Sequence, residues 1–199
     1  MDKETKKYLI DNYQTLFLKH GDKPEAVQWS REGQQFRFEK LTQIADLRDK
    51  RILDVGCGKG DMYPFLLKKF GNVDYTGIDI VPESLAYAAQ RYPQASFYCR
   101  DLLEEAVDEK FDYALISGVF NNYIPKSSEF LRELVIAAFK QCELGIGFNF
   151  LSTYVNYTSA DMAYHDPVKI FDFCLKMLSP KVMIHHHYER CDVVIFAYR

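Results

Sequence analysis

A run of alternating glycines has the residue types of a nucleotide-binding turn. Residues 53–61 read LDVGCGKGD, and the three glycines follow directly on a β-prone segment. Glycines at this spacing let the backbone turn sharply and approach a ligand without interference from a Cβ atom. A merely tight turn would use the same glycines, so the residues around the run must decide what it binds.

Two carboxylates narrow the choice of ligand. Asp79 ends the next β-prone run about 20 residues after the glycines, which is the distance at which an acid meets ribose hydroxyls; the alternative is a helix N-cap. A dinucleotide fingerprint would have glycine where the chain has Asp61. A carboxylate in that first helical turn also opposes a bound pyrophosphate, because two anions would share one positive helix end. The run therefore favours a nucleoside without phosphate.

The elements that must position these residues alternate along the chain. Apolar residues at helical spacing over 4–19 and 35–46 predict two N-terminal helices. Strands are expected at 51–55, 73–80, 95–100, 111–117 and 145–151, and helices at 61–70, 82–91, 127–141 and 166–178. Residues 181–188 and 193–198 predict a C-terminal antiparallel hairpin. This alternation predicts an α/β fold, a doubly wound and mostly parallel sheet that binds ligands at the carboxyl ends of its strands.

Length and charge limit the organisation and the partners. With 199 residues, 48% of them hydrophobic, we expect one domain over 1–199, formed by a helical cap (1–50) and a Rossmann-like core (51–199). The net charge of -3 provides no overall basic field for phosphate backbones, so nucleic acid is an unlikely partner.

The chain carries no signal for membranes or export. No apolar run approaches the roughly 20 residues of a membrane span, and the charged start is not followed by an apolar signal region. The five cysteines are odd in number and dispersed, unlike a disulfide framework or a metal site. We expect a soluble cytoplasmic protein with reduced thiols.

Residues 51–118 resemble the motifs of the class I S-adenosylmethionine-dependent methyltransferases. The acidic-x-Gly-x-Gly-x-Gly loop of that family matches Asp54 through Gly60, its ribose acid matches Asp79, and its adenine-side acid matches Asp101. The segment 111–118 matches the wall after the family's fourth strand. The resemblance implies a seven-stranded sheet with one reversed strand, S-adenosyl-L-methionine as cofactor and S-adenosyl-L-homocysteine as product. It says almost nothing about the acceptor, and we expect a small molecule because the charge balance disfavours nucleic acid.

The same resemblance implies roles for individual residues. Glycines of the loop would line the methionine portion, Ile80 and Leu102 would flank the adenine, and Ser117 or Gly118 would lie near the sulfonium. Independently of the resemblance, Arg37 could pair with the cofactor's carboxylate and Trp29 could cover the sulfonium or the substrate; the alternatives are a surface arginine and a core tryptophan. The predicted cofactor-binding residues are Trp29, Arg37, Asp54, Gly56, Cys57, Gly58, Asp79, Ile80, Asp101, Leu102, Ser117 and Gly118.

Methyl transfer from a sulfonium requires alignment and exclusion of water more than a catalytic base. If a base is used, His165 is the preferred candidate because its ordinary pKa near 6.5 leaves a neutral imidazole, and Tyr123 is the second. The wider set of acceptor-wall candidates is Tyr123, Asn149, Tyr154, Tyr157, Tyr164 and His165. Residues 121–123 lack both prolines of the motif of some amino-group methyltransferases, which counts against nucleobases and protein side chains as acceptors.

Other interpretations stay open at this stage. In the run 185–187 only His185 and His187 share a strand face and no third ligand is placed by spacing, so we predict no metal site. A nicotinamide-dependent oxidoreductase and a non-catalytic S-adenosylmethionine-binding protein are the alternative functions. The sequence predicts neither the acceptor, nor the atom methylated, nor the oligomeric state.

Overall fold

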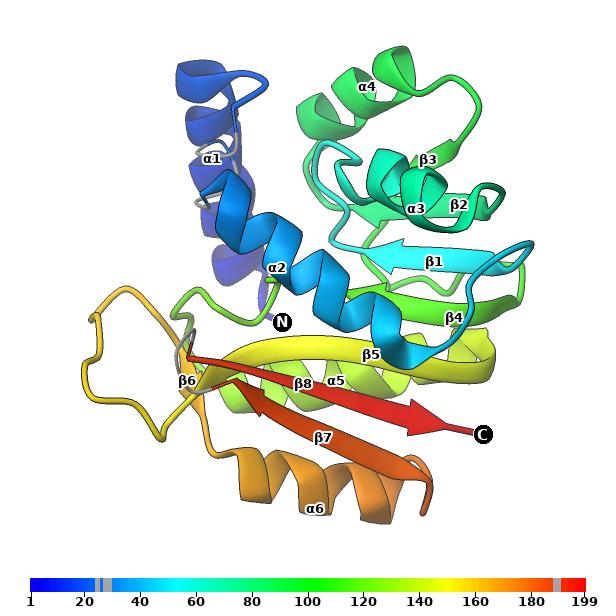
Figure 1. Ribbon diagram of the computed structural model, residues 1–199. Coiled ribbons are helices and arrows are strands. Elements are labelled where there is room, and N and C mark those ends of the chain that lie inside the picture. Colours follow the sequence, from blue (N-terminus) through cyan, green and yellow to red (C-terminus); the bar gives the residue numbers. More distant parts are fainter. Residues whose placement is uncertain (24–25, 27–29, 188–190) are drawn as a thin grey trace.

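The computed structural model describes residues 1–23, 26, 30–187 and 191–199 as one sheet with helices packed on both faces (Figure 1). The strands are β1 (Arg51–Val55), β2 (Asp74–Asp79), β3 (Ser96–Cys99), β4 (Phe111–Ile116), β5 (Cys142–Ser152), β6 (Tyr164–His165), β7 (Val182–His187) and β8 (Asp192–Tyr198). The helices are α1 (Lys3–His20), α2 (Arg31–Leu41), the 3-10 turn η2 (Thr42–Ile44), α3 (Met62–Phe70), α4 (Pro82–Arg91), α5 (Ser127–Gln141) and α6 (Pro167–Met177).

The sheet runs in the order β3-β2-β1-β4-β5-β8-β7, with the short β6 paired to β5 off this path. β1 to β5 pair in parallel, whereas β8 is antiparallel to both β5 and β7. This order confirms the predicted fold class, including the reversed strand and the terminal hairpin. The strand order reverses between β1 and β4, and at such a switch point the crossover helices leave a crevice beyond the carboxyl ends of the strands.

The two faces of the sheet are buried under different helices. One apolar cluster joins α5 and α6 to the sheet, and a second joins α2 and α3 to the opposite face. Neighbours along β1 enter different clusters: Leu53 belongs to the first and Ile52 to the second. A parallel strand covered on both faces reads as a continuous apolar run, and this explains the segment at 51–55.

The helix at the end of the N-terminal region starts earlier than its sequence pattern predicts. α2 begins at Arg31, with the Ser30 hydroxyl accepting the Gly33 amide, and the chain tightens into η2 where the prediction continued to residue 46. The first turn of α2 is polar, so periodicity alone did not detect it.

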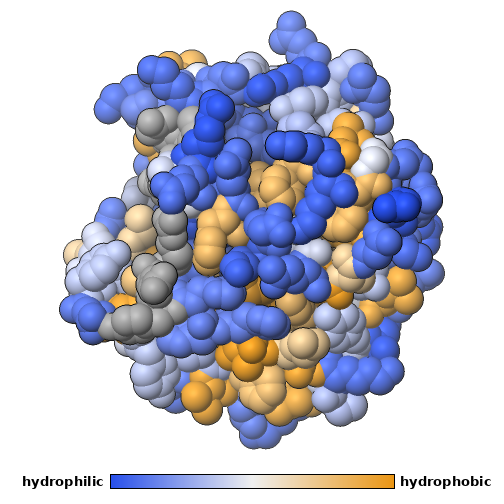
Figure 2. Space-filling view, viewed as in Figure 1, coloured by the Kyte–Doolittle hydropathy of each residue, from blue (hydrophilic) through white to orange (hydrophobic). Residues whose placement is uncertain are grey.

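The face seen in Figure 2 is mostly hydrophilic, with apolar side chains gathered low on the view over the edge strand β7. Met183 and Ile184 of that strand are exposed. Within the described residues, no helix combines the length and apolarity that crossing a membrane requires.

Candidate active site

The glycine loop connects β1 to α3 in a conformation that requires its glycines. Gly56, Gly58 and Gly60 have φ values of 74°, 52° and 72°, in the left-handed region that side chains disfavour. A Cβ atom on Gly56 would collide with the Val119 side chain, and one on Gly60 would lie 2.8 Å from the Phe97 ring. The first glycine thus lets the loop after β4 approach, and the third lets β3 pack beneath the turn.

Asp79, at the end of β2, forms hydrogen bonds with the backbone of this loop. One of its oxygens accepts the Gly58 amide at 2.8 Å and the other accepts the Val81 amide at 3.0 Å. Burial raises the pKa of the Asp79 carboxyl, while these amide donors oppose that rise. Carboxylate oxygens accept more than one hydrogen bond each, so Asp79 retains capacity for a diol.

Asp54 lies under the same loop and is buried. The Tyr75 hydroxyl donates to it at 2.6 Å, and burial raises its pKa to about 7. The Asp54 carboxyl is therefore a buried polar group next to the glycine loop.

A cavity of about 140 Å³ opens at the carboxyl ends of β1, β2 and β4, and α1 covers it through Leu9 and Tyr13. The Asn122 side-chain amide donates a hydrogen bond to the Tyr13 hydroxyl at 2.5 Å, and this contact joins α1 to the loop after β4. This cavity brings together most of the predicted cofactor residues: Gly56, Gly58, Asp79, Ile80, Asp101, Leu102, Ser117 and Gly118.

A second cavity of about 50 Å³ adjoins the first and shares Gly56, Gly58 and Ser117 with it. Three further predicted residues line it: Arg37, Asp54 and Cys57. The remaining predicted residue, Trp29, lies outside the described residues. The two cavities together form one elongated site along the glycine loop.

Charged side chains of the site already have protein partners. Asp101 accepts the Leu103 amide at 3.0 Å with one oxygen, and Lys6 of α1 contacts its other oxygen at 2.9 Å. Arg37 is buried against Asp192, with its Nε 3.2 Å from one carboxylate oxygen and its Nη2 3.1 Å from the other. An adenine amino group at Asp101 would therefore share that carboxylate with Lys6.

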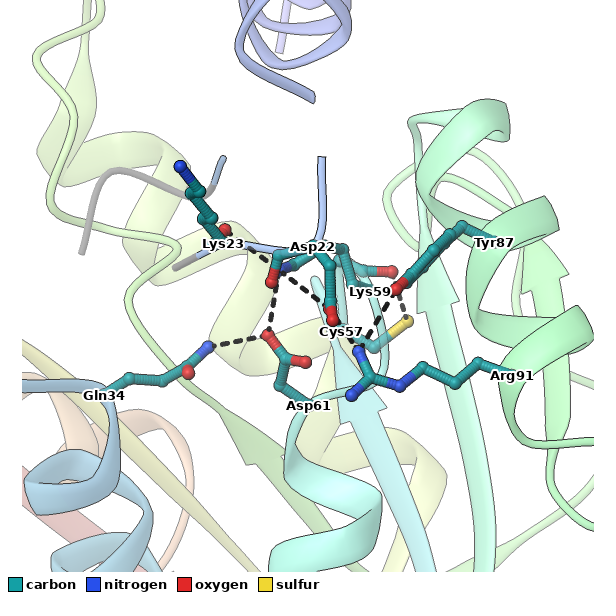
Figure 3. A network of polar contacts seen from close by, with 9 residues as sticks. Asp22, Lys23, Gln34, Cys57, Lys59, Asp61, Tyr87 and Arg91 are labelled. Carbon is teal, nitrogen blue, oxygen red and sulfur yellow. Dashed lines mark hydrogen bonds and ion pairs between the residues drawn. The ribbon is translucent and has the colours of Figure 1, made fainter. Parts of the chain in front are cut away.

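Lys59 fastens the chain beyond α1 to the glycine loop, as Figure 3 shows. Its buried ammonium donates to the carbonyl oxygens of Asp22 and Lys23 at 2.7 and 3.0 Å, and it lies 3.5 Å from the Asp61 carboxylate. Asp61 in turn accepts from the Gln34 side chain at 3.1 Å. On the other side of this network, Arg91 and Tyr87 of α4 point toward Asp22 in Figure 3.

The structure places His165 inside the protein. Its Nε2 lies 3.2 Å from the Phe120 carbonyl oxygen and its Nδ1 lies 3.3 Å from the Ser128 hydroxyl. Because a carbonyl only accepts, the proton belongs on Nε2, and Nδ1 accepts from Ser128. Burial lowers the pKa of His165. The lowered pKa favours the neutral imidazole that a base requires. Both ring nitrogens are engaged, however, and His165 is not among the described residues that line either cavity.

The other acceptor-wall candidates differ in exposure. Tyr164 is half-buried, and its hydroxyl accepts the Ser159 amide at 3.0 Å. Asn149 is buried and donates and accepts hydrogen bonds within the protein. Exposed side chains of the loops after β4 and β5 are Tyr123, Tyr154 and Tyr157. Those loops pair through a β-bridge between Asn122 and Met162. Tyr123 lies outside the described lining of both cavities, and the catalytic roles of His165 and Tyr123 stay predictions.

Several residues of the site were not found by the sequence patterns. Leu9 and Tyr13 lie on a helix recognised only by its periodicity, and Lys59 was read as a variable position between glycines. A lysine inside a glycine-rich turn is the one local signal available. The partners of Arg37 and Lys59 are distant in sequence and needed the fold.

The histidine run follows the predicted alternation. The His185 and His187 rings stack with centroids 6.2 Å apart, whereas the His186 Nε2 lies 2.8 Å from the Ser152 hydroxyl. Among the residues that the structure describes, no group of three or more metal-ligating side chains is found.

The doubly wound sheet with its reversed strand and the glycine loop with its downstream acid define a Rossmann-like fold that binds a nucleoside-containing cofactor. Residues 52–137 match the model of a family described as a methyltransferase domain. The chain is 32% identical over 158 residues to the "Putative methyltransferase Rv1506c" of Mycobacterium tuberculosis, covering 73% of this chain and 91% of that protein. The chain belongs to the class I S-adenosylmethionine-dependent methyltransferases.

Two further comparisons extend this result. The chain is 31% identical over 143 residues to the chloroplastic tocopherol O-methyltransferase of Arabidopsis thaliana, which covers 61% of this chain but only 40% of that enzyme. The crystal structure of magnesium protoporphyrin IX methyltransferase from Synechocystis with bound S-adenosylmethionine superposes with a TM-score of 0.73 at 16% identity, covering 100% of this chain and 98% of that one. At this identity the structural match establishes the fold.

Proposed function

We propose that the chain binds S-adenosylmethionine along the glycine loop and transfers its methyl group to a small organic acceptor. The observation that carries the proposal is the convergence on one cavity of glycines, a ribose-suited carboxylate and apolar walls from β1, β2, β4 and the segment after β3. The relatives named for tocopherol and magnesium protoporphyrin IX favour a small-molecule acceptor.

The residues present fit this cofactor. Because Gly56 has no Cβ atom, Val119 packs against the backbone of the glycine loop, and both residues line the cavity where the cofactor would lie. Asp79 provides acceptors for a ribose diol, and Ile80 and Leu102 provide apolar surfaces for a purine. In the second cavity, Arg37 provides a cation at the position proposed for the methionyl carboxylate.

The chain's own residues then hold the reactants in place. When bound, the cofactor supplies an activated methyl group on a sulfonium. Ser117 and Gly118 line the cavity where we place that group, and α1 excludes water from it through Leu9 and Tyr13. The paired loops after β4 and β5 are the proposed acceptor side. The tyrosines there give an acceptor with rings or apolar parts a surface to contact.

The proposal is tested by adding S-adenosylmethionine and a panel of phenols, carboxylic acids and amines and measuring S-adenosylhomocysteine release. We expect turnover with at least one compound. Asp79→Asn should reduce cofactor affinity roughly tenfold or more, because a hydrogen bond to a charged group contributes about 1.5–3 kcal/mol. Asp74→Asn, exposed at the start of the same strand, is the matched control and should bind normally. Cofactor binding with transfer only to macromolecules would contradict the small-acceptor proposal.

A further inference from the structure

A buried network of polar side chains connects helix α2 to β8, the last strand along the sequence. Arg37 of α2 and Asp192 of β8 are 155 residues apart in sequence, yet the guanidinium meets both carboxylate oxygens at 3.2 and 3.1 Å. Asn149 of β5 also belongs to this network, because its side-chain amide nitrogen donates to Asp192 at 2.6 Å. Asn149 and Asp192 are at most 1% exposed.

At its other end, this network contacts the backbone of Gly118, in the loop after β4. The Asn149 carbonyl oxygen accepts the Gly118 amide at 2.8 Å, and Gly118 has a φ of 76°, a conformation that an ordinary residue adopts only with strain. Asn149 thereby uses both ends of its side chain, one for the loop after β4 and one for the carboxylate. A single buried network fixes a glycine of the loop and the orientation of a carboxylate at once.

The two ends of the network lie at different cavities. Gly118 lines the larger cavity and Arg37 lines the smaller one. Buried ion pairs add little to stability compared with apolar residues of the same volume, because both charges lose their hydration. A contribution to stability therefore does not explain why Arg37 and Asp192 are buried here. Keeping the two cavities in a fixed position relative to each other would explain it.

We propose that Asp192 and Asn149 are positioning residues for methyl transfer, with Asp192 fixing the Arg37 guanidinium at the methionyl end of the cofactor and Asn149 fixing the Gly118 backbone beside its sulfonium. This inference rests on the proposed function. Asp192 and Asn149 act only through Arg37 and Gly118. The network makes the methionyl half of the site depend on β5 and β8, while the adenosine half depends on β2 and the segment after β3.

Two ligands can test the methionyl and adenosine halves of the site separately, and neither test requires the acceptor to be known. S-adenosylhomocysteine contains the whole product, and 5′-methylthioadenosine keeps the adenosine and the sulfur but has no amino and carboxylate groups. Calorimetry should show that Asp192→Asn weakens S-adenosylhomocysteine roughly tenfold, the effect of about 1.4 kcal/mol in one charge-assisted contact. In this variant, binding of 5′-methylthioadenosine should stay within about twofold of the parent protein, since that ligand has no carboxylate to contact Arg37. Asn149→Leu should weaken both ligands, because both carry the sulfur that we place beside Gly118.

Further variants separate positioning from folding. Arg37→Lys, which keeps a cation beside Asp192, should retain more S-adenosylhomocysteine affinity than Arg37→Met. Ser152→Ala removes a buried polar side chain from β5 outside the network and should leave both ligands unchanged even if it lowers Tm. If Asp192→Asn does not fold, Arg37→Lys and Arg37→Met carry the same comparison.

The outcomes are distinct. Selective loss of S-adenosylhomocysteine in Asp192→Asn, with loss of both ligands in Asn149→Leu, supports the positioning roles. Lower Tm with unchanged affinity for both ligands, or equal loss of both ligands in Asp192→Asn, would overturn them and leave a purely structural role. A parent protein that binds neither ligand would overturn the proposed function itself.

Discussion

At the scale of single residues, the site works by placing carboxylates in different environments. Asp79 meets two backbone amides at the cavity wall, while Asp54 lies beneath the loop with one tyrosine hydroxyl. Amide donors favour the charged form of a carboxyl and burial disfavours it. Burial raises the pKa of both carboxyls, and we expect Asp54, whose pKa is raised to about 7, to change its protonation near neutral pH.

The protonation of Asp54 should be visible in the pH dependence of stability. Its folded pKa, raised by burial to about 7, exceeds the ordinary value of 3.8, so between these values the folded chain holds a proton that the unfolded chain releases. The stabilisation linked to this proton is complete below pH 3.8 and is lost as the pH rises through 7. Urea unfolding of the ligand-free protein should show that the parent loses a few kcal/mol, on the order of 3, relative to Asp54→Asn between pH 4 and 8.

Asp54→Asn is a suitable reference because asparagine still accepts the Tyr75 hydroxyl and leaves the other carboxyls of the chain unchanged. The difference between the two proteins therefore isolates one group. Parallel stability curves over this range would show that Asp54 is ionised in the folded protein and that its burial is relieved by a contact other than the Tyr75 hydroxyl.

The third glycine of the loop should be sensitive to one added methyl group. In Gly60→Ala the new Cβ would meet the Phe97 ring at 2.8 Å in a backbone conformation with φ of 72°, so strain and overpacking add. Gly71→Ala is the matched control, with φ of 83° and nothing within 4 Å of its Cβ position. Denaturation should place Gly60→Ala about 1–3 kcal/mol below Gly71→Ala, and equal losses would mean that Phe97 moves aside without cost.

At the scale of elements, the site depends on how α1 and the chain after it are fastened to the core. Lys59 binds two carbonyl oxygens there, and Lys6 and Tyr13 make further contacts along α1. Because α1 covers the larger cavity, we expect these contacts to oppose local unfolding of α1 and opening of the cavity. The lysine inside the glycine loop is thus an anchor for the cover as well as a part of the loop.

Replacing this anchor should loosen the cover. Lys59→Met keeps the length of a buried side chain but removes the donor, leaving the Asp22 and Lys23 carbonyls without it. We expect faster hydrogen exchange of the α1 amides and a loss of about 1–3 kcal/mol in stability. Lys68→Met, exposed on α3, should change neither. A loss of stability with unchanged exchange in α1 would show that Lys59 supports only the glycine loop.

The same scale shows where sequence reasoning succeeds. The helices at 82–91 and 127–141 have the predicted bounds, because proline or serine at the start and an apolar stripe define them locally. α2 was placed late because its first turn is polar, and β6 was missed because it has only two residues. The glycine loop and the acids after its strands were predicted by local motifs. The contact between Arg37 and Asp192 was not, because a pairing over 155 residues exists only in the folded sheet.

At the scale of the whole molecule, the strand order places one crevice between β1 and β4, and dinucleotide-binding proteins use the same kind of crevice. The side chains that line the crevice, rather than the strand order, therefore determine which ligand binds. Here the position of a dinucleotide fingerprint glycine holds Asp61, which contacts Lys59 and Gln34. A pyrophosphate at this helix start would face that carboxylate, whereas a phosphate-free nucleoside would not.

A thermal unfolding comparison tests this discrimination on the intact protein. A ligand at about 100 times its Kd stabilises the folded state by about 2.7 kcal/mol, which for a chain of this size raises Tm by roughly 5–11 °C. We expect that shift with S-adenosylhomocysteine and none with NAD at the same concentration. Asp79→Asn should reduce the first shift, because it removes a charge that the ribose needs. A shift with NAD alone would mean that Asp61 turns away and leaves the helix start to a phosphate, in conflict with its contacts to Lys59 and Gln34.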